Sequence, residues 1–97
     1  MPVYISLFQW TDDGVKDVKN AVKRVDANIK MVEQAGGRVL GTYWTHGPYD
    51  FIAISEWPDE MMVSAAALTI AEKGMTHGLT LRAFNAEEMQ RIIDKMP

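Results

Sequence analysis

The hydrophobic and polar positions along the chain follow two different periods. Residues 3–10 form a β-branched and aromatic run that is typical of a strand. Over residues 15–32 the apolar side chains instead recur at alternating steps of three and four, which predicts one amphipathic helix of about five turns. Thr11 is the expected N-cap of this helix, and the glycine pair at 36–37 is its expected end.

The middle of the chain predicts three further strands and a second helix. Residues 38–46 and 49–57 form two strands joined through Gly47-Pro48, and residues 76–84 form a fourth strand. The dipeptide Pro58-Asp59 opens the second helix. Its small-residue face comprises Met62, Ala65, Ala66, Thr69 and Ile70.

The last segment predicts a C-terminal helix. Asn85 and Glu88 stand in the spacing of a capping box, in which each side chain accepts a hydrogen bond from the other residue's backbone. The expected buried stripe of this helix comprises Met89, Ile92, Ile93 and Met96.

The order of elements is βαββαβ with an added helix, which is the split-βαβ or ferredoxin-like pattern. Right-handed crossovers then predict an antiparallel sheet with strand order 4-1-3-2 and both long helices on one face. We therefore expect an α+β protein in which residues 1–97 form a single domain.

Both faces of the predicted sheet are apolar, although the helices can cover only one of them. In the first strand one face carries Val3, Ile5 and Leu7, and the other carries Tyr4, Phe8 and Trp10. In the third strand Ile52 and Ile54 oppose Phe51, Ala53 and Trp57. Soluble monomers rarely expose such a patch. The pattern therefore predicts a homodimer, sheet against sheet, or a higher homo-oligomer.

Composition and charge narrow the classes of partner. The net charge is −3, and the Lys and Arg residues are spread among Asp and Glu, so neither nucleic acid nor an anionic membrane is an expected partner. The absence of cysteine excludes disulfides, thiolate metal sites and a cysteine nucleophile. The first residues show no targeting signal or membrane-spanning run, and a cytoplasmic location is expected.

Candidate chemistry is concentrated in the pentapeptide His46–Asp50. A histidine with an ordinary pKa near ~6.5 serves as acid or base at neutral pH. His46, Tyr49 and Asp50 are therefore candidate catalytic residues, and the candidate ligand-binding residues are Tyr4, Tyr43, Trp44 and Arg82. The alternative is structural: the pentapeptide is a turn, Asp50 accepts its hydrogen bonds, and the aromatic residues belong to the core or the dimer interface.

The expected strand order also suggests which candidates meet. It is expected to gather His46, Asp50 and Arg82 at one end of the sheet and His77 at the other, roughly 25 Å away. We therefore expect Asp50 or an anionic ligand to pair with Arg82, and we expect the two histidines to be too far apart to share a metal. No metal site and no cofactor is predicted.

Three stretches of the chain together resemble the GYD-domain family. They are YISLFQWTDDG, YWTHGPYDFIAISEWPDE and TLRAFNAEEM. The Gly-Tyr-Asp motif that names the family reads here Gly47-Pro48-Tyr49-Asp50, either with a proline inserted or with Pro48 in place of the usual glycine. The resemblance implies the dimeric α+β-barrel superfamily, whose members include cofactor-independent oxygenases, haem-degrading enzymes, isomerases and stress-response proteins. The GYD family itself has no settled biochemical role, so the resemblance implies little about activity.

The sequence therefore predicts a small homo-oligomeric binding or accessory protein for an apolar or aromatic metabolite. The alternative is a cofactor-independent oxygenase or isomerase that uses His46, Tyr49 or Asp50 as proton-handling groups. The two hypotheses differ in one structural requirement. The enzyme needs His46 and Asp50 to line a cavity large enough for a ligand.

Overall fold

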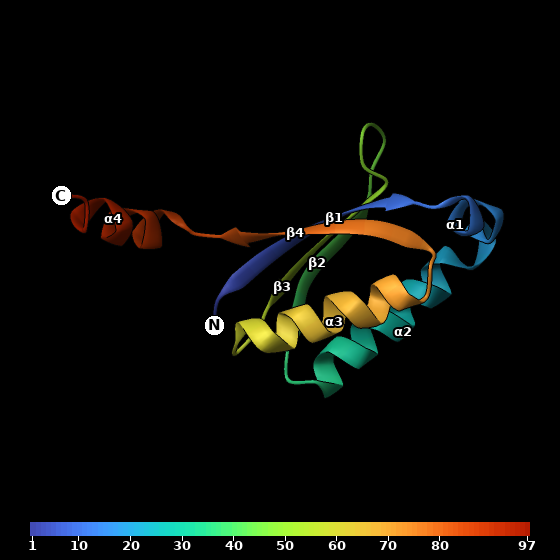
Figure 1. The fold of residues 1–97 in the computed structure, drawn as a ribbon, viewed down its shortest axis with the longest axis horizontal. Coiled ribbons are helices and arrows are strands. Elements are labelled where there is room, and N and C mark those ends of the chain that lie inside the picture. The colour runs from blue at the N-terminus through green and yellow to red at the C-terminus, as the bar shows by residue number, and fades with distance from the viewer.

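A four-stranded antiparallel sheet forms one layer of the protein, and two helices cover one of its faces (Figure 1). A computed structural model describes residues 1–97. The strands are β1 (Val3–Trp10), β2 (Arg38–Trp44), β3 (Phe51–Glu56) and β4 (Thr76–Ala83), in the order β2-β3-β1-β4. This is the predicted order 4-1-3-2 read from the opposite edge, and it confirms the α+β ferredoxin-like class.

The central strand β1 pairs antiparallel with both of its neighbours. Phe8 lies opposite Phe51 on β3, and Tyr4 lies opposite Arg82 on β4. The beginning of β1 therefore lies beside the ends of β3 and β4. The expectation that His46 and His77 lie at opposite ends of the sheet is wrong, because β3 and β4 both run antiparallel to β1 and begin at the same end. His77, near the beginning of β4, consequently shares an end of the sheet with the β2–β3 loop.

The helices are α1 (Asp12–Lys16), α2 (Ala21–Gln34), α3 (Glu60–Glu72) and α4 (Ala86–Asp94), with a 3₁₀ turn, η1 (Val18–Asn20), between the first two. One continuous helix over residues 15–32 is therefore a wrong prediction. Asn20 Nδ2 donates to Asp17 Oδ1 at 2.7 Å, and Arg24 Nη1 donates to the Asp17 carbonyl at 2.7 Å. These local bonds compete with helical hydrogen bonds and interrupt the helix at this point.

The core lies between the sheet and the helices. Tyr4, Val32, Trp57 and Ala66 form its buried cluster. The predicted division of the first strand into two faces is confirmed. Tyr4 and Phe8 face the helices, while Ile5 and Leu7 face away. The predicted face of α3 is confirmed at Ala66, which is buried, and at Met62 and Ile70, which are half-buried. It is wrong at two exposed positions, Ala65 and Thr69.

The C-terminal helix α4 projects away from the rest of the molecule (Figure 1). Its predicted capping box is present, with Glu88 N donating to Asn85 Oδ1 at 2.8 Å and Asn85 N donating to Glu88 Oε1 at 3.1 Å. The prediction that its apolar stripe is buried is wrong, because no other segment of the chain covers it. The stripe residues are 39% to 68% exposed: Met89, Ile92, Ile93 and Met96.

Candidate functional site

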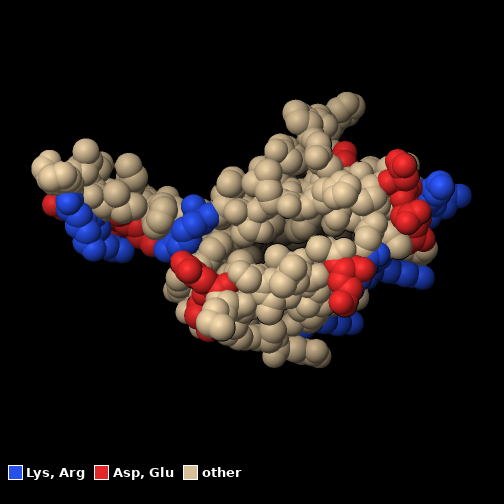
Figure 2. Space-filling model, viewed as in Figure 1, with Lys and Arg blue, Asp and Glu red and all other residues tan.

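A cavity of about 290 Å³ lies between the sheet and the two helices that cover it. Figure 2 shows the hollow between the two layers. Its floor is made by aromatic side chains on the helix-facing side of the sheet, namely Phe8, Trp10, Trp44, Phe51 and Trp57. Its roof is made by smaller side chains of α2 and α3, which include Val25, Ile29, Val63, Ala66, Ala67 and Ile70.

The aromatic floor is built by neighbouring strands. The Phe51 ring lies 5.0 Å from the Trp44 ring and 5.9 Å from the Phe8 ring, measured between centroids. Phe8 in turn lies over Gly78 of β4, where a Cβ would come within 2.8 Å of the ring. Such tilted rings, spaced at 4.5–7 Å, are a favourable packing of aromatic side chains. The strand pairing therefore fixes a rigid apolar platform under the cavity.

The polar groups around the cavity are few and mostly paired within the chain. Trp57 Nε1 donates to Ser55 Oγ at 3.0 Å, and this pair is buried. At one end, Lys73 Nζ of α3 donates to Asn28 Oδ1 of α2 at 2.7 Å. Because Asn28 is uncharged, the ammonium of Lys73 has no neutralising partner in this contact.

The walls of the cavity decide what it can hold. Of the 27 residues that line it, 18 are hydrophobic. Water is held poorly by apolar walls that offer few hydrogen-bond partners. The cavity therefore favours an apolar occupant.

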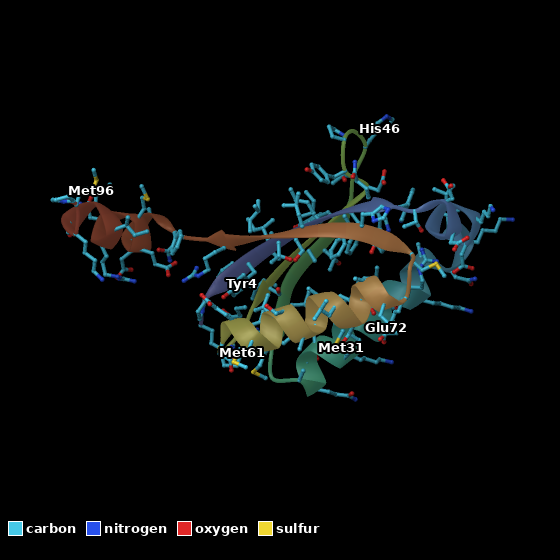
Figure 3. All side chains as sticks on the ribbon, in the orientation of Figure 1. Tyr4, Met31, His46, Met61, Glu72 and Met96 are labelled. Carbon is cyan, nitrogen blue, oxygen red and sulfur yellow. The ribbon has the colours of Figure 1, made fainter.

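The pentapeptide loop lies outside this cavity. His46 is exposed at the tip of the β2–β3 loop and points away from the body of the protein (Figure 3). Asp50 Oδ2 accepts a hydrogen bond from Trp10 N at 2.9 Å, and Asp50 N donates to Phe8 O at 2.8 Å. Neither His46, Tyr49 nor Asp50 lines the cavity. In this structure Asp50 ties the loop to the end of β1.

The predicted pairing of Asp50 with Arg82 is wrong. The antiparallel register places Arg82 opposite Tyr4, whereas Asp50 is beside Trp10 at the other end of β1. Arg82 Nη2 instead pairs with Glu88 Oε2 at 3.5 Å, and its guanidinium lies over the Phe84 ring at 4.4 Å from the centroid.

The remaining ligand-binding candidates occupy three different environments. Trp44 lines the cavity. Tyr43, its neighbour on β2, is 62% exposed and does not line the cavity. Tyr4 is buried in the core cluster, and its hydroxyl has no hydrogen-bond partner within the chain.

Sequence reasoning missed the cavity-lining role of several residues. The sequence pattern assigns Phe8 and Phe51 each to one face of its own strand and names neither as a ligand-binding residue. The signal that connects them is an aromatic sheet face opposite the alanine-rich segment of α3.

The structure contains no group of three or more His, Cys, Asp or Glu side chains placed to hold a metal ion. None of its helices has both the length and the hydropathy required to cross a membrane.

Comparison with known proteins agrees with this architecture. The chain has an α+β fold like that of a solved crystal structure from Thermus thermophilus, with a TM-score of 0.56 and 22% sequence identity over 89% of this chain and 96% of the other. Residues 4–93 match the GYD domain. The chain therefore belongs to the GYD-domain family.

One relative is the "Glutamine synthetase and cystathionine beta-lyase binding protein" of Thermus thermophilus. It is 34% identical to this chain over 90 residues, which cover 92% of this chain and 95% of the relative. The two proteins therefore correspond over nearly their whole lengths.

The structural role of Asp50 is testable by mutation. We expect Asp50→Ala to lower the free energy of unfolding by about 2 kcal/mol, because it leaves the Trp10 N–H without its charged acceptor. Asp50→Asn keeps an acceptor oxygen and should lose about half as much. Urea unfolding followed by tryptophan fluorescence measures both. His46→Ala is the control and should change stability by less than about 0.5 kcal/mol. Equal stability of Asp50→Ala and the unmodified protein would contradict this role.

Proposed function

We propose that this protein is a homodimeric accessory protein that binds a small apolar or aromatic molecule between its sheet and its helices. The observation that carries the proposal is the cavity of about 290 Å³ over a floor of aromatic rings. Ligand sites are typically concave and apolar, with a few polar groups that orient the ligand. Lys73 at one end of this cavity supplies a cation for an acidic group on the ligand.

The geometry gives the enzyme alternative no support. Its proposed proton-handling groups, His46, Tyr49 and Asp50, lie outside the cavity, and the Asp50 carboxylate already accepts the Trp10 N–H. A general base must come within hydrogen-bond reach of the proton that it removes. A ligand in the cavity would meet aromatic rings and alanine methyl groups instead. Binding without chemistry is therefore the better interpretation.

The proposed ligand site is tested with the fluorescent probe 8-anilinonaphthalene-1-sulfonate, which combines aromatic rings with one acidic group. Ala67→Phe places a ring in the roof of the cavity, and Ala65→Phe places the same ring on α3 at a position that does not line it. We expect Ala67→Phe to weaken probe binding at least about tenfold, which corresponds to about 1.4 kcal/mol. Ala65→Phe should bind as the unmodified protein does. Equal binding by both variants would place the probe elsewhere and contradict the proposal.

Self-association through the uncovered sheet face is part of the same proposal. On that face the strand register aligns two apolar rows, which we call the outer face: Ile52, Leu7 and Leu79 in one row, and Ile54, Ile5 and Leu81 in the other. Leu79 and Leu81 are 42% and 47% exposed. A face shared by identical copies supports an isologous dimer, in which the same patch meets itself.

The outer-face dimer predicts a concentration-dependent mass. In sedimentation equilibrium we expect the unmodified chain to be a dimer at micromolar concentration and Leu81→Glu to be a monomer, because a charge there would be buried against the second copy. Leu68→Glu is the matched control, since Leu68 is 71% exposed on α3 in the opposite layer. A dimer that persists in Leu81→Glu would show that the outer face is not the interface.

A second candidate function is docking on a metabolic enzyme. It is favoured by the relative whose name describes binding to glutamine synthetase and cystathionine beta-lyase. The exposed side of α3 offers a surface that the proposed dimer leaves free, with Met61 and Leu68 83% and 71% exposed. On this proposal the protein acts in the cytoplasm together with such enzymes.

Docking on an enzyme is tested by surface plasmon resonance with purified glutamine synthetase and purified cystathionine beta-lyase. We expect Leu68→Glu to weaken binding at least about tenfold, because it puts a charge in an apolar contact. Ser64→Glu, also on α3 and exposed, should have a smaller effect. Absence of binding to either enzyme by the unmodified chain would contradict this second candidate.

A further inference from the structure

The C-terminal arm, residues 84–97, extends to one side of the two layers (Figure 1). Its helix α4 has nine residues. Isolated helices shorter than about 12–15 residues are marginal in water, and protein helices gain most of their stability by packing an apolar face. The stripe of Met89, Ile92, Ile93 and Met96 is such a face, and nothing in its own chain covers it. The arm therefore requires a packing partner.

Contacts at the base of the arm hold it away from its own sheet. The Arg82 guanidinium lies over the Phe84 ring, and Arg82 Nη2 pairs with Glu88 Oε2 at 3.5 Å. The backbone hydrogen bond from Asn85, together with the charge of Arg82, lowers the pKa of Glu88 and keeps its carboxylate charged for this pair. Folding the arm back over the outer face would break these contacts. The partner is therefore outside the chain.

The arm and the outer face are directed to the same side of the molecule. In Figure 1 the helices α2 and α3 lie below the sheet, so the outer face is turned upward. In the same view, Figure 2 shows the Lys and Arg residues at the end of the arm on its lower side and residues without charge along its upper side. The apolar stripe of the arm therefore extends the apolar surface of the sheet.

The overall dimensions indicate that this surface is unusually large for a monomer. The radius of gyration is 14.7 Å, whereas a compact chain of this length has about 12.5 Å. The accessible surface is 6809 Å², whereas a monomer of this mass exposes about 5,600 Å². The excess of about 1,200 Å² exceeds the ≈ 800 Å² that each partner buries in a standard interface. A second copy of the chain has surface enough to accept the arm.

We propose that the arm of each copy packs its apolar stripe on a second copy of this chain, so that the two copies clasp each other through their C-terminal helices. The proposal rests on the homodimer proposed above and adds a contact to it. In an isologous dimer the arm contact is made twice, because the two-fold symmetry places the arm of each copy on the same surface of the other. The clasp explains why the sequence specifies a capped amphipathic helix that has no partner in its own chain.

The arm contact is tested with two glutamate substitutions in α4. Ile93→Glu puts a charge in the apolar stripe, whereas Gln90→Glu puts the same charge on a position of α4 outside it. Burial of one isoleucine side chain is worth enough to change the dimer dissociation constant at least about tenfold. In sedimentation equilibrium we therefore expect Ile93→Glu to raise this constant by that factor, and Gln90→Glu to leave it within about twofold. Thermal unfolding followed by circular dichroism checks that both variants fold.

A second measurement locates the arm directly. The chain has no cysteine, so Met96→Cys labelled with benzophenone maleimide carries a single photo-crosslinker at the end of the arm. In a mixture of isotopically light and heavy chains, mass spectrometry should find crosslinks that join one copy to the other. Crosslinks confined to single chains would overturn the proposal.

The outcomes separate this proposal from the dimer on which it rests. A dimer whose dissociation constant is the same in Ile93→Glu and Gln90→Glu would overturn the arm contact and leave the outer-face dimer standing. An unmodified chain that stays monomeric at every concentration would overturn both. Weakening by Ile93→Glu together with crosslinks between copies would support the arm contact.

Discussion

The structure depends on one constraint: the central strand β1 carries large apolar side chains on both of its faces. Its antiparallel pairing with β3 and β4 places Phe8 and Trp10 over the interior and Ile5 and Leu7 on the opposite side. Two helices can cover only one face of a sheet, so the other face stays uncovered within the chain. The same alternation that builds the core therefore also leaves an apolar surface uncovered within the chain.

The side chains on the two sides of the interior differ in size. Aromatic rings form the sheet side, while α3 contributes mostly alanine, so the layers enclose space instead of filling it. Protein interiors are normally packed to the density of organic crystals. The hollow between the layers departs from that density.

The sequence was a good guide to the elements and the sheet faces, because strand alternation and helix periodicity are local properties. It was a poor guide to four features that depend on how particular side chains and segments meet. The positions of Asp50 and Arg82 depend on which end of the sheet carries the β2–β3 loop. The break before α2 depends on hydrogen bonds to the Asp17 side chain and carbonyl. The exposure of the α4 stripe and the volume of the cavity depend on how far apart the layers settle, which no residue pattern encodes.

The central claim is that two other molecules bind this chain: a second copy packs on the outer face, and a small molecule occupies the cavity. Native mass spectrometry of the freshly purified full chain tests it most directly, because one spectrum reports the mass of the assembly and any small molecule that it retains. The account predicts the mass of a dimer with an additional small molecule that is released by mild collisional activation. A bare monomer at micromolar concentration would contradict it.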